Sequence, residues 1–422
     1  MKIQNLKSVD LFQNEFYNQY KNAILEFEQY RNNVLPLCAA ENIISEFSKQ
    51  PLMYGLQERY ILDGYLNYNE ETNMIGSKKL LPFYDIINSQ CKSLFGALYT
   101  DCRSLSGMNA LQNILLALVK PEDTILILSP ESGGHAALPN ILKKLDVNYL
   151  DAPFDYDEID YAYKEINSIV NEKNIDFILF APTDIIFFPD FSKFEIPYKT
   201  KVIFDASQIL AFYINNQVKN PLSMKNRVIL LGGTHKTIPG VAKALIMTND
   251  EQLAKEIDET INPLYLRNTH MQNVASLILT LIEMEYYANN YCCNMSVNSN
   301  YLGAKLKQYG LDIINRRGLF SETHQLFIHM SQKDVNDFYK LSNEFGISLN
   351  KKFKKLFKGY GIRLGVQEIS RYGWDKEEMD IIAQILFLIY IKETKDIPKL
   401  LEYFKGRKEI QYTFKGEKEN DK

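Results

Sequence analysis

The most informative stretch is Gly232-Gly233-Thr234-His235-Lys236-Thr237-Ile238-Pro239-Gly240, a glycine-flanked turn that directly follows the apolar run 228–231. A lysine held at the end of a buried strand is partly desolvated, so it can exist as the neutral amine that condenses with a carbonyl. Most lysines in loops lie on the surface and do no chemistry. The stretch therefore predicts either a Schiff-base lysine, Lys236, or an ordinary surface lysine.

A second apolar run, 202–204, ends on a carboxylate, Asp205, upstream of Lys236. A lysine that forms a Schiff base and an aspartate that pairs with a ring nitrogen are the two groups expected of a pyridoxal phosphate enzyme. The pair favours the catalytic interpretation of Lys236 and predicts pyridoxal 5'-phosphate as the cofactor.

Composition bounds the remaining function classes. The chain has 422 residues, 46% of them apolar, and a net charge of −4, which suits two or three globular domains and suggests no polyanionic partner such as nucleic acid. The five cysteines have no metal-ligand spacing, so we expect neither a zinc site nor a disulfide framework. The amino terminus shows no signal-peptide pattern and no apolar run is long enough to span a membrane, so we expect a cytoplasmic protein.

Short apolar runs alternate with polar or helical stretches between residues 124 and 248. The runs are 124–128, 177–180, 202–204, 228–231 and 244–247. Buried strands separated by crossovers predict an α/β fold with a mostly parallel sheet between helices. Ligands bind at the carboxyl ends of such strands, where Thr183, Asp205 and Lys236 fall.

Two further segments suit a cofactor. Ser106-Gly107-Met108 opens a helical pattern over 110–118, so its free backbone N–H groups either hold a phosphate or simply belong to an ordinary cap. Ser132-Gly133-Gly134-His135 follows the first apolar run. His135 is either a structural histidine or a contact of the cofactor.

These segments resemble the cofactor segments of serine hydroxymethyltransferase and its relatives among fold-type I pyridoxal phosphate enzymes, and the resemblance covers nearly the whole chain. It implies the aspartate aminotransferase-like fold, with a large domain built on the parallel sheet and a smaller α+β domain after it. The implied divisions are a helical arm at a dimer interface (1–60), a large cofactor-binding domain (61–290) and a small carboxyl-terminal domain (291–422).

The resemblance also implies roles for individual residues around the cofactor. Lys236 would bind it covalently, Asp205 would keep its ring nitrogen protonated, and His135 would stack on its ring. The remaining implied cofactor contacts are Ser106, Gly107, Met108, Thr183, Gln208 and His235.

Substrate contacts are implied in the same way. Arg363 lies in an apolar strand pattern, 361–365, where a guanidinium needs an anion. A structural Asp or Glu could supply that anion, whereas the resemblance implies the α-carboxylate of an amino-acid substrate. Tyr60 matches a tyrosine that reaches into the active site of the neighbouring subunit. An aromatic stripe over 10–31 predicts a helix, which by resemblance packs across a homodimer with shared active sites.

Several positions depart from the family pattern on the substrate side. The catalytic glutamate falls on Asp63 in a lengthened loop, a paired tyrosine is replaced by Met74 and Ile75, and a serine that helps hold the substrate carboxylate is Ala40. Gln208 stands where a histidine is expected. The proline-rich folate loop is reduced to the nine residues 352–360, which contain no proline.

From these departures we predict a folate-independent aldol or transaldol exchange at Cβ of serine, threonine or glycine, with an aldehyde as second substrate. A conventional tetrahydrofolate-dependent serine hydroxymethyltransferase is the first alternative. An aminotransferase and a non-catalytic cofactor-binding scaffold are the others.

Overall fold

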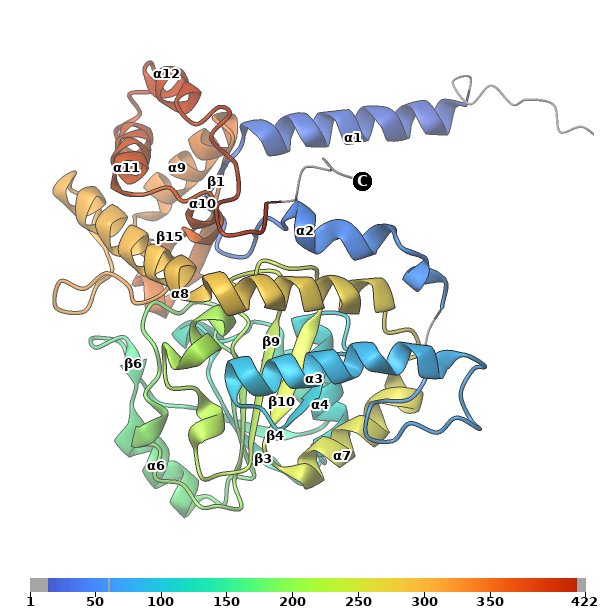
Figure 1. The fold of residues 1–422 in the computed structure, drawn as a ribbon. Coiled ribbons are helices and arrows are strands. Elements are labelled where there is room, and N and C mark those ends of the chain that lie inside the picture. The colour runs from blue at the N-terminus through green and yellow to red at the C-terminus, as the bar shows by residue number, and fades with distance from the viewer. Residues whose placement is uncertain (1–13, 60, 416–422) are drawn as a thin grey trace, which may run out of the picture.

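The computed structural model describes residues 14–59 and 61–415, and its centre is a seven-stranded sheet with strand order β2-β10-β9-β8-β7-β3-β4 (Figure 1). Five neighbouring strands, from β4 to β9 in that order, run parallel. β10 pairs antiparallel with β9, and β2 pairs antiparallel with β10. The predicted mostly parallel sheet is thereby confirmed. The strands are β2 (Tyr99–Asp101), β3 (Thr124–Ile127), β4 (Asn148–Asp151), β7 (Phe177–Phe180), β8 (Lys201–Asp205), β9 (Val228–Gly233) and β10 (Ala244–Thr248).

Helices cover both faces of this sheet, because successive side chains of a buried strand point to opposite faces. In β9, Ile229 and Leu231 join the core under α4 (Gly107–Leu118), α5 (Leu138–Lys144) and α7 (Glu251–Thr260). Val228 and Leu230 join the core under α3 (Leu81–Phe95), α6 (Tyr163–Glu172) and α8 (Met271–Gln308). Both faces of the sheet are apolar. Because five of its strands run parallel, the polar groups that follow those strands meet at their shared carboxyl end.

A second sheet of four strands, in the order β11-β12-β15-β14, forms the smaller layer. Its strands are all antiparallel: β11 (Asp312–Ile313), β12 (Gln325–His329), β14 (Asn350–Lys354) and β15 (Gly359–Gly365). The helices around it are α9 (Gln332–Glu344), α10 (Gln367–Arg371), α11 (Lys376–Ile391) and α12 (Ile397–Glu402). A capping box formed by Asp375 and Glu378 begins α11.

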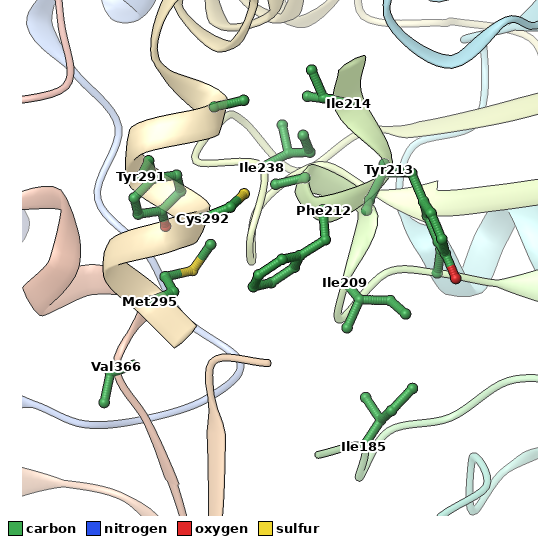
Figure 2. Packing of buried hydrophobic residues seen from close by; sticks show 14 of the residues in the cluster. Ile185, Ile209, Phe212, Tyr213, Ile214, Ile238, Tyr291, Cys292, Met295 and Val366 are labelled. Atoms are coloured by element: carbon green, nitrogen blue, oxygen red, sulfur yellow. The ribbon is translucent and has the colours of Figure 1, made fainter. Parts of the chain in front are cut away.

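The long helix α8 connects the two layers. It packs on α3 in the large layer and on α11 in the small one, and the predicted boundary at residue 290 falls inside it. Figure 2 shows its residues Cys292 and Met295 beside Phe212 and Ile238. These residues belong to one buried cluster. Since Phe212 follows Asp205 and Ile238 follows Lys236 closely in the chain, this core fixes the backbone behind both residues.

The amino-terminal helix α1 runs over Glu15–Asn33 and lies away from the central sheet (Figure 1). Its aromatic stripe is largely exposed: Phe16 is 78% and Phe27 57% accessible, and no residue of α1 is buried. After α1 the chain forms β1 (Leu35–Pro36), which pairs with β13 (Ile347–Ser348), and then the short helix α2 (Glu46–Lys49).

Candidate active site

Lys236 lies in the turn that leaves β9. The Thr234 hydroxyl donates to the Val241 carbonyl at 2.8 Å, and the Thr234 carbonyl accepts from the Gly240 amide at 3.0 Å, so the turn closes on itself. Asn42 donates through its side chain to the Lys236 carbonyl. Burial lowers the pKa of the Lys236 ammonium, an effect that the nearby Asp205 carboxylate opposes. A lysine with a lowered pKa more readily supplies the neutral amine that bonds to a carbonyl.

Asp205, the last residue of β8, is 8% exposed and is held by its neighbours. Its Oδ1 accepts from the Ser207 amide at 2.9 Å and from the Ser207 hydroxyl at 2.5 Å. The same hydroxyl accepts from the Gly233 amide at 2.8 Å. These bonds join the ends of β8 and β9 and fix the carboxylate beside Lys236.

The start of α4 presses against the same strand ends. Ser106 caps the helix by accepting from the Asn109 amide at 3.2 Å, which leaves the Gly107 and Met108 amides without intrahelical partners. A Cβ on Gly107 would lie 2.9 Å from the Ser207 hydroxyl and 3.4 Å from the Gly233 Cα, so only glycine fits. Free amides at a helix start beside glycine backbone suit a phosphate.

His235 and His135 flank this region. Burial, with Lys236 adding to it, lowers the pKa of His235 to about 4, and its Nδ1 is buried without a partner among the described residues. Burial also lowers the pKa of His135, whose Nδ1 accepts from the Ala137 amide at 3.2 Å. Both imidazoles are therefore neutral near pH 7. The unpartnered Nδ1, the free amides and the lysine–aspartate pair fit pyridoxal phosphate.

Thr183 lies next to the turn that carries His135. Its amide donates to the Gly133 carbonyl at 2.8 Å, and its hydroxyl donates to the same carbonyl at 3.2 Å. Gly134 cannot carry a side chain, because a Cβ would lie 2.0 Å from the Leu128 carbonyl oxygen. The turns that follow β3 and β7 are thus locked together.

Gln208 contacts the lysine itself. With its amide oxygen facing Lys236, Gln208 accepts from Nζ at 3.3 Å and donates to the Ala39 carbonyl at 3.1 Å. The resemblance implied Gln208 as a cofactor contact, but no sequence pattern predicted its bond to Lys236. His324, fully buried before β12, was not identified from the sequence either. Its Nε2 lies 3.3 Å from the Ala39 carbonyl oxygen.

Arg363, in β15, is 4% exposed and already has a carboxylate partner. Its Nη1 donates to Asp184 at 2.9 Å and to the Thr183 carbonyl at 2.6 Å, while Nη2 donates to Asn350 at 2.7 Å. This is the structural carboxylate that the sequence left open as one of two explanations. Arg363 also contributes to the lowered pKa of Lys236, so its charge acts on the reactive lysine. A role in substrate binding stays a prediction.

Asp184 has two further cationic neighbours besides Arg363. Lys352 lies 3.2 Å and Lys354 2.6 Å from its carboxylate oxygens. Burial alone would raise the pKa of Asp184, but Arg363, Lys354 and Lys352 lower it to about 2. An acidic residue directly after Thr183 and a lysine-rich segment before β15 were the sequence signals, and neither showed that the two would meet.

The predicted residues of the segment 61–76 lie away from Lys236 and Asp205. Asp63 accepts from the Asn69 amide at 2.9 Å, and Asn67 donates to Asp258 of α7 at 2.8 Å, so this segment lies against α7. Met74 and Ile75 are exposed. Tyr60 lies outside the described residues. In the described part of the chain, no hydrogen bond or ion pair joins Asp63 to Lys236, Asp205 or His135.

The described residues contain no group of three or more His, Cys, Asp or Glu side chains that could hold a metal ion. Within the same ranges, every helix is too short or too polar to cross a membrane.

Comparison with known proteins places this site in a family. The sequence profile of serine hydroxymethyltransferase matches residues 15–386. The serine hydroxymethyltransferase of Saccharolobus islandicus strain M.14.25 is 27% identical over 93% of each chain, and that of Pyrobaculum aerophilum is 28% identical over 94% of this chain and 95% of its own. The crystal structure of L-threonine transaldolase from Pseudomonas fluorescens in its internal aldimine state has a TM-score of 0.87 and 22% identity, with 94% of each chain covered.

The transaldolase likeness shows the shared fold, and the profile spans the strands, the lysine turn and the small sheet described above. The chain therefore belongs to the serine hydroxymethyltransferase family of fold-type I pyridoxal phosphate enzymes, with pyridoxal phosphate as its cofactor.

Proposed function

We propose that this enzyme catalyses a folate-independent aldol or transaldol exchange at Cβ of a small amino acid, with an aldehyde as the second substrate. The observation that carries the proposal is the structure of residues 350–365. In the family pattern this region holds a proline-rich folate loop, and here it is a short β-hairpin.

The connection between the two strands of the hairpin is short. β14 pairs with β15 from Asn350 opposite Arg363 to Lys354 opposite Gly359, so only residues 355–358 connect the strands. Those residues make one 3-10 turn whose Leu356 and Phe357 are buried. A loop that wraps a pteridine needs several exposed, adaptable residues, and this connection has four residues of which two are buried.

When bound, pyridoxal phosphate acts as an electron sink for charge that develops at Cα. In this proposal Lys236 holds the cofactor covalently, Asp205 holds the proton on its ring nitrogen, and His135 lies against its ring. Ser106 and the Gly107 and Met108 amides hold its phosphate. The remaining proposed contacts are Thr183, Gln208 and His235 around the cofactor, and Arg363 and Tyr60 at the substrate.

Arg363 holds the substrate carboxylate in this proposal and so fixes which bond at Cα is aligned for cleavage. Gln208 accepts a hydrogen bond from Lys236. A glutamine has no titrating proton near neutrality, so Lys236 itself is the base that can move a proton at this point. Asp63 retains the proposed role of a carboxylate near the substrate in the assembled enzyme.

The alternative, a conventional serine hydroxymethyltransferase, is supported by the names of the curated relatives. The fold also hosts transaldol chemistry in the Pseudomonas fluorescens enzyme. The deciding assay offers the holoenzyme serine with tetrahydrofolate, and separately threonine with a panel of aldehydes, with Lys236→Ala as the inactive control. We expect aldehyde exchange and little folate-dependent glycine formation. Robust folate-dependent glycine formation without aldehyde exchange would contradict the proposal.

The active form in this proposal is a cytoplasmic homodimer with shared active sites. Support comes from α1, whose apolar side chains Phe16, Tyr20 and Phe27 are exposed in the single chain. A stripe of this kind on a helix usually packs on a partner. Sedimentation of the holoenzyme should show a dimer, and full activity in a demonstrated monomer would refute this part of the proposal.

A further inference from the structure

The hairpin that replaces the folate loop brings two lysines to the substrate side of the site. We infer that the second substrate carries an anionic group, a carboxylate or a phosphate, which Lys352 and Lys354 bind. The inference rests on the proposed function and specifies the chemical class of its aldehyde.

Successive side chains of β14 point to opposite faces, and this alternation places both lysines on the same face. Asn350, Lys352 and Lys354 share one face of the strand, and all three contact Arg363 or Asp184. Lys351 and Phe353 point the other way. Lys351 is exposed and donates to Asn336 at 2.9 Å, while Phe353 is 67% exposed. The strand therefore presents a charged inner face and an outer face without contacts to the site.

The inner face has more positive charge than its own carboxylate balances. Arg363, Lys352 and Lys354 surround the single acid Asp184, which leaves a net charge of +2 on these four side chains. One amino-acid carboxylate at Arg363 would reduce the excess to +1. Buried charge without a counter-ion is costly, so a second anion would be stabilised here.

The exposure of the four side chains shows where that anion would approach. Asp184 is 0% and Arg363 5% exposed at the side chain, whereas Lys352 is 18% and Lys354 12% exposed. The lysines thus form the accessible side of the cluster. Burial is the main cause that lowers the pKa of Lys352; Asp184 opposes this shift, and Arg363 and Lys354 add to it.

The cluster also lies beside the residues proposed to hold the cofactor ring. Lys354 Nζ is 3.4 Å from the Gly134 carbonyl, next to His135, and Thr183 precedes Asp184. At the tip of the hairpin, the Lys355 amide donates to Glu131 at 2.7 Å. These contacts hold the lysines at the carboxyl ends of β3 and β7, where the second substrate must enter if it reacts at the cofactor.

A purely structural role is the competing explanation, in which Asp184 joins the hairpin to the large layer. Each explanation predicts a different result for Lys352→Met and Lys354→Met, with Lys351→Met as the matched control. The control removes the same charge from the same strand but on the outer face. The structural role predicts a lower melting temperature without a change in aldehyde preference.

The test compares matched aldehydes in exchange with threonine by the holoenzyme: succinic semialdehyde against butanal, and glycolaldehyde phosphate against glycolaldehyde. We expect kcat/KM to favour at least one anionic member by about tenfold or more, the scale of a hydrogen bond to a charged group. Lys352→Met and Lys354→Met should remove most of this preference, and Lys351→Met should keep it. The pair that shows the preference identifies carboxylate or phosphate.

A second measurement does not depend on turnover. Calorimetric titration of the glycine-loaded holoenzyme with succinate and with 2-phosphoglycolate should show binding that weakens about tenfold in Lys354→Met and not in Lys351→Met. Exchange of neutral aldehydes without preference for anions, and without anion binding, would overturn the inference while leaving the proposed function intact. Anion binding at these lysines without any aldehyde exchange would overturn the proposed function and, with it, the assignment of the anion to an aldehyde.

Discussion

The proposed cofactor side and the proposed substrate side of this site are built differently. On the cofactor side, Asp205, Ser207 and Gly233 are joined by short local hydrogen bonds, and Gly107 packs so closely that a Cβ would meet the Ser207 hydroxyl at 2.9 Å. On the substrate side, Asp184 gathers three cations from two strands of another sheet. The first arrangement leaves no room for change, whereas the second is held by long side chains that a substitution can alter one at a time.

The difference suggests how this chain diverged within its family. Close contacts around Gly107 and Gly134 leave no space for a side chain, so a cofactor site built from such backbone tolerates few sequences. A site made of charged side chains on a hairpin can change its ligand when a few residues change. Of the departures from the family pattern, Gln208 contacts Lys236 and the short hairpin carries the lysines around Asp184. Met74 and Ile75 are exposed in a segment that lies against α7.

The largest expected effect is on the cofactor side. Lys236→Ala should lower kcat by about 10³-fold or more, the scale for removing a catalytic nucleophile. Borohydride reduction of the wild-type holoenzyme should fix the cofactor on the peptide that contains Lys236, and the variant should show no labelled peptide. Labelling of a different lysine would mean that the cofactor side has been assigned to the wrong turn.

A smaller effect is expected on the substrate side. Arg363→Met should leave cofactor absorbance nearly intact, because the residues proposed to hold the cofactor are untouched. It should weaken amino-acid binding by about 2–5 kcal/mol, the cost of truncating one partner of a buried charge pair. Titration with glycine measures this affinity.

Asp184→Asn is the matched control for that experiment, because it removes the structural partner and keeps the guanidinium. If Arg363 binds substrate, glycine affinity should survive in Asp184→Asn and fall in Arg363→Met. Equal glycine affinity in wild type and Arg363→Met would assign Arg363 to the structural role alone.

The two sides also differ in how far the sequence predicted them. Lys236 and Asp205 each follow an apolar run, so their meeting at one edge of a parallel sheet follows from strand direction alone. That the segment 352–360 is short was visible from its nine residues, but its folding into a hairpin was not predicted. The contact of Asp184 with Lys354 was not predictable, since it joins residues 170 positions apart, one in the turn after β7 and the other in β14 of the second sheet. Periodicity gives the face of a strand but not the strand that will oppose it.

His324 was missed for a related reason. A lone histidine before an apolar run has no local pattern that separates a core residue from a site residue. Its place between the two sides depends on the contact with Ala39, far away in the chain. The aromatic stripe predicted a helix over 10–31, and within the described residues the helix runs over Glu15–Asn33.

The smallest expected effect concerns His324, which lies where the two sides meet. Burial lowers its pKa to about 3, and the charges of Arg363 and Lys236 act in the same direction, while the bond to the Ala39 carbonyl opposes them. In the unfolded chain its pKa returns to about 6.5. Between about pH 6.5 and pH 3 the unfolded chain therefore binds a proton that the folded protein does not, so this histidine makes stability fall as the pH falls. The contribution approaches about 1.4 kcal/mol per pH unit.

His324→Asn, which cannot titrate, should unfold in urea with a shallower loss of stability between pH 6 and pH 4 than the wild type, whatever its stability at pH 7. Parallel pH profiles for the two proteins would mean that His324 is already protonated in the fold, with an anion beside it that balances Lys236 and Arg363.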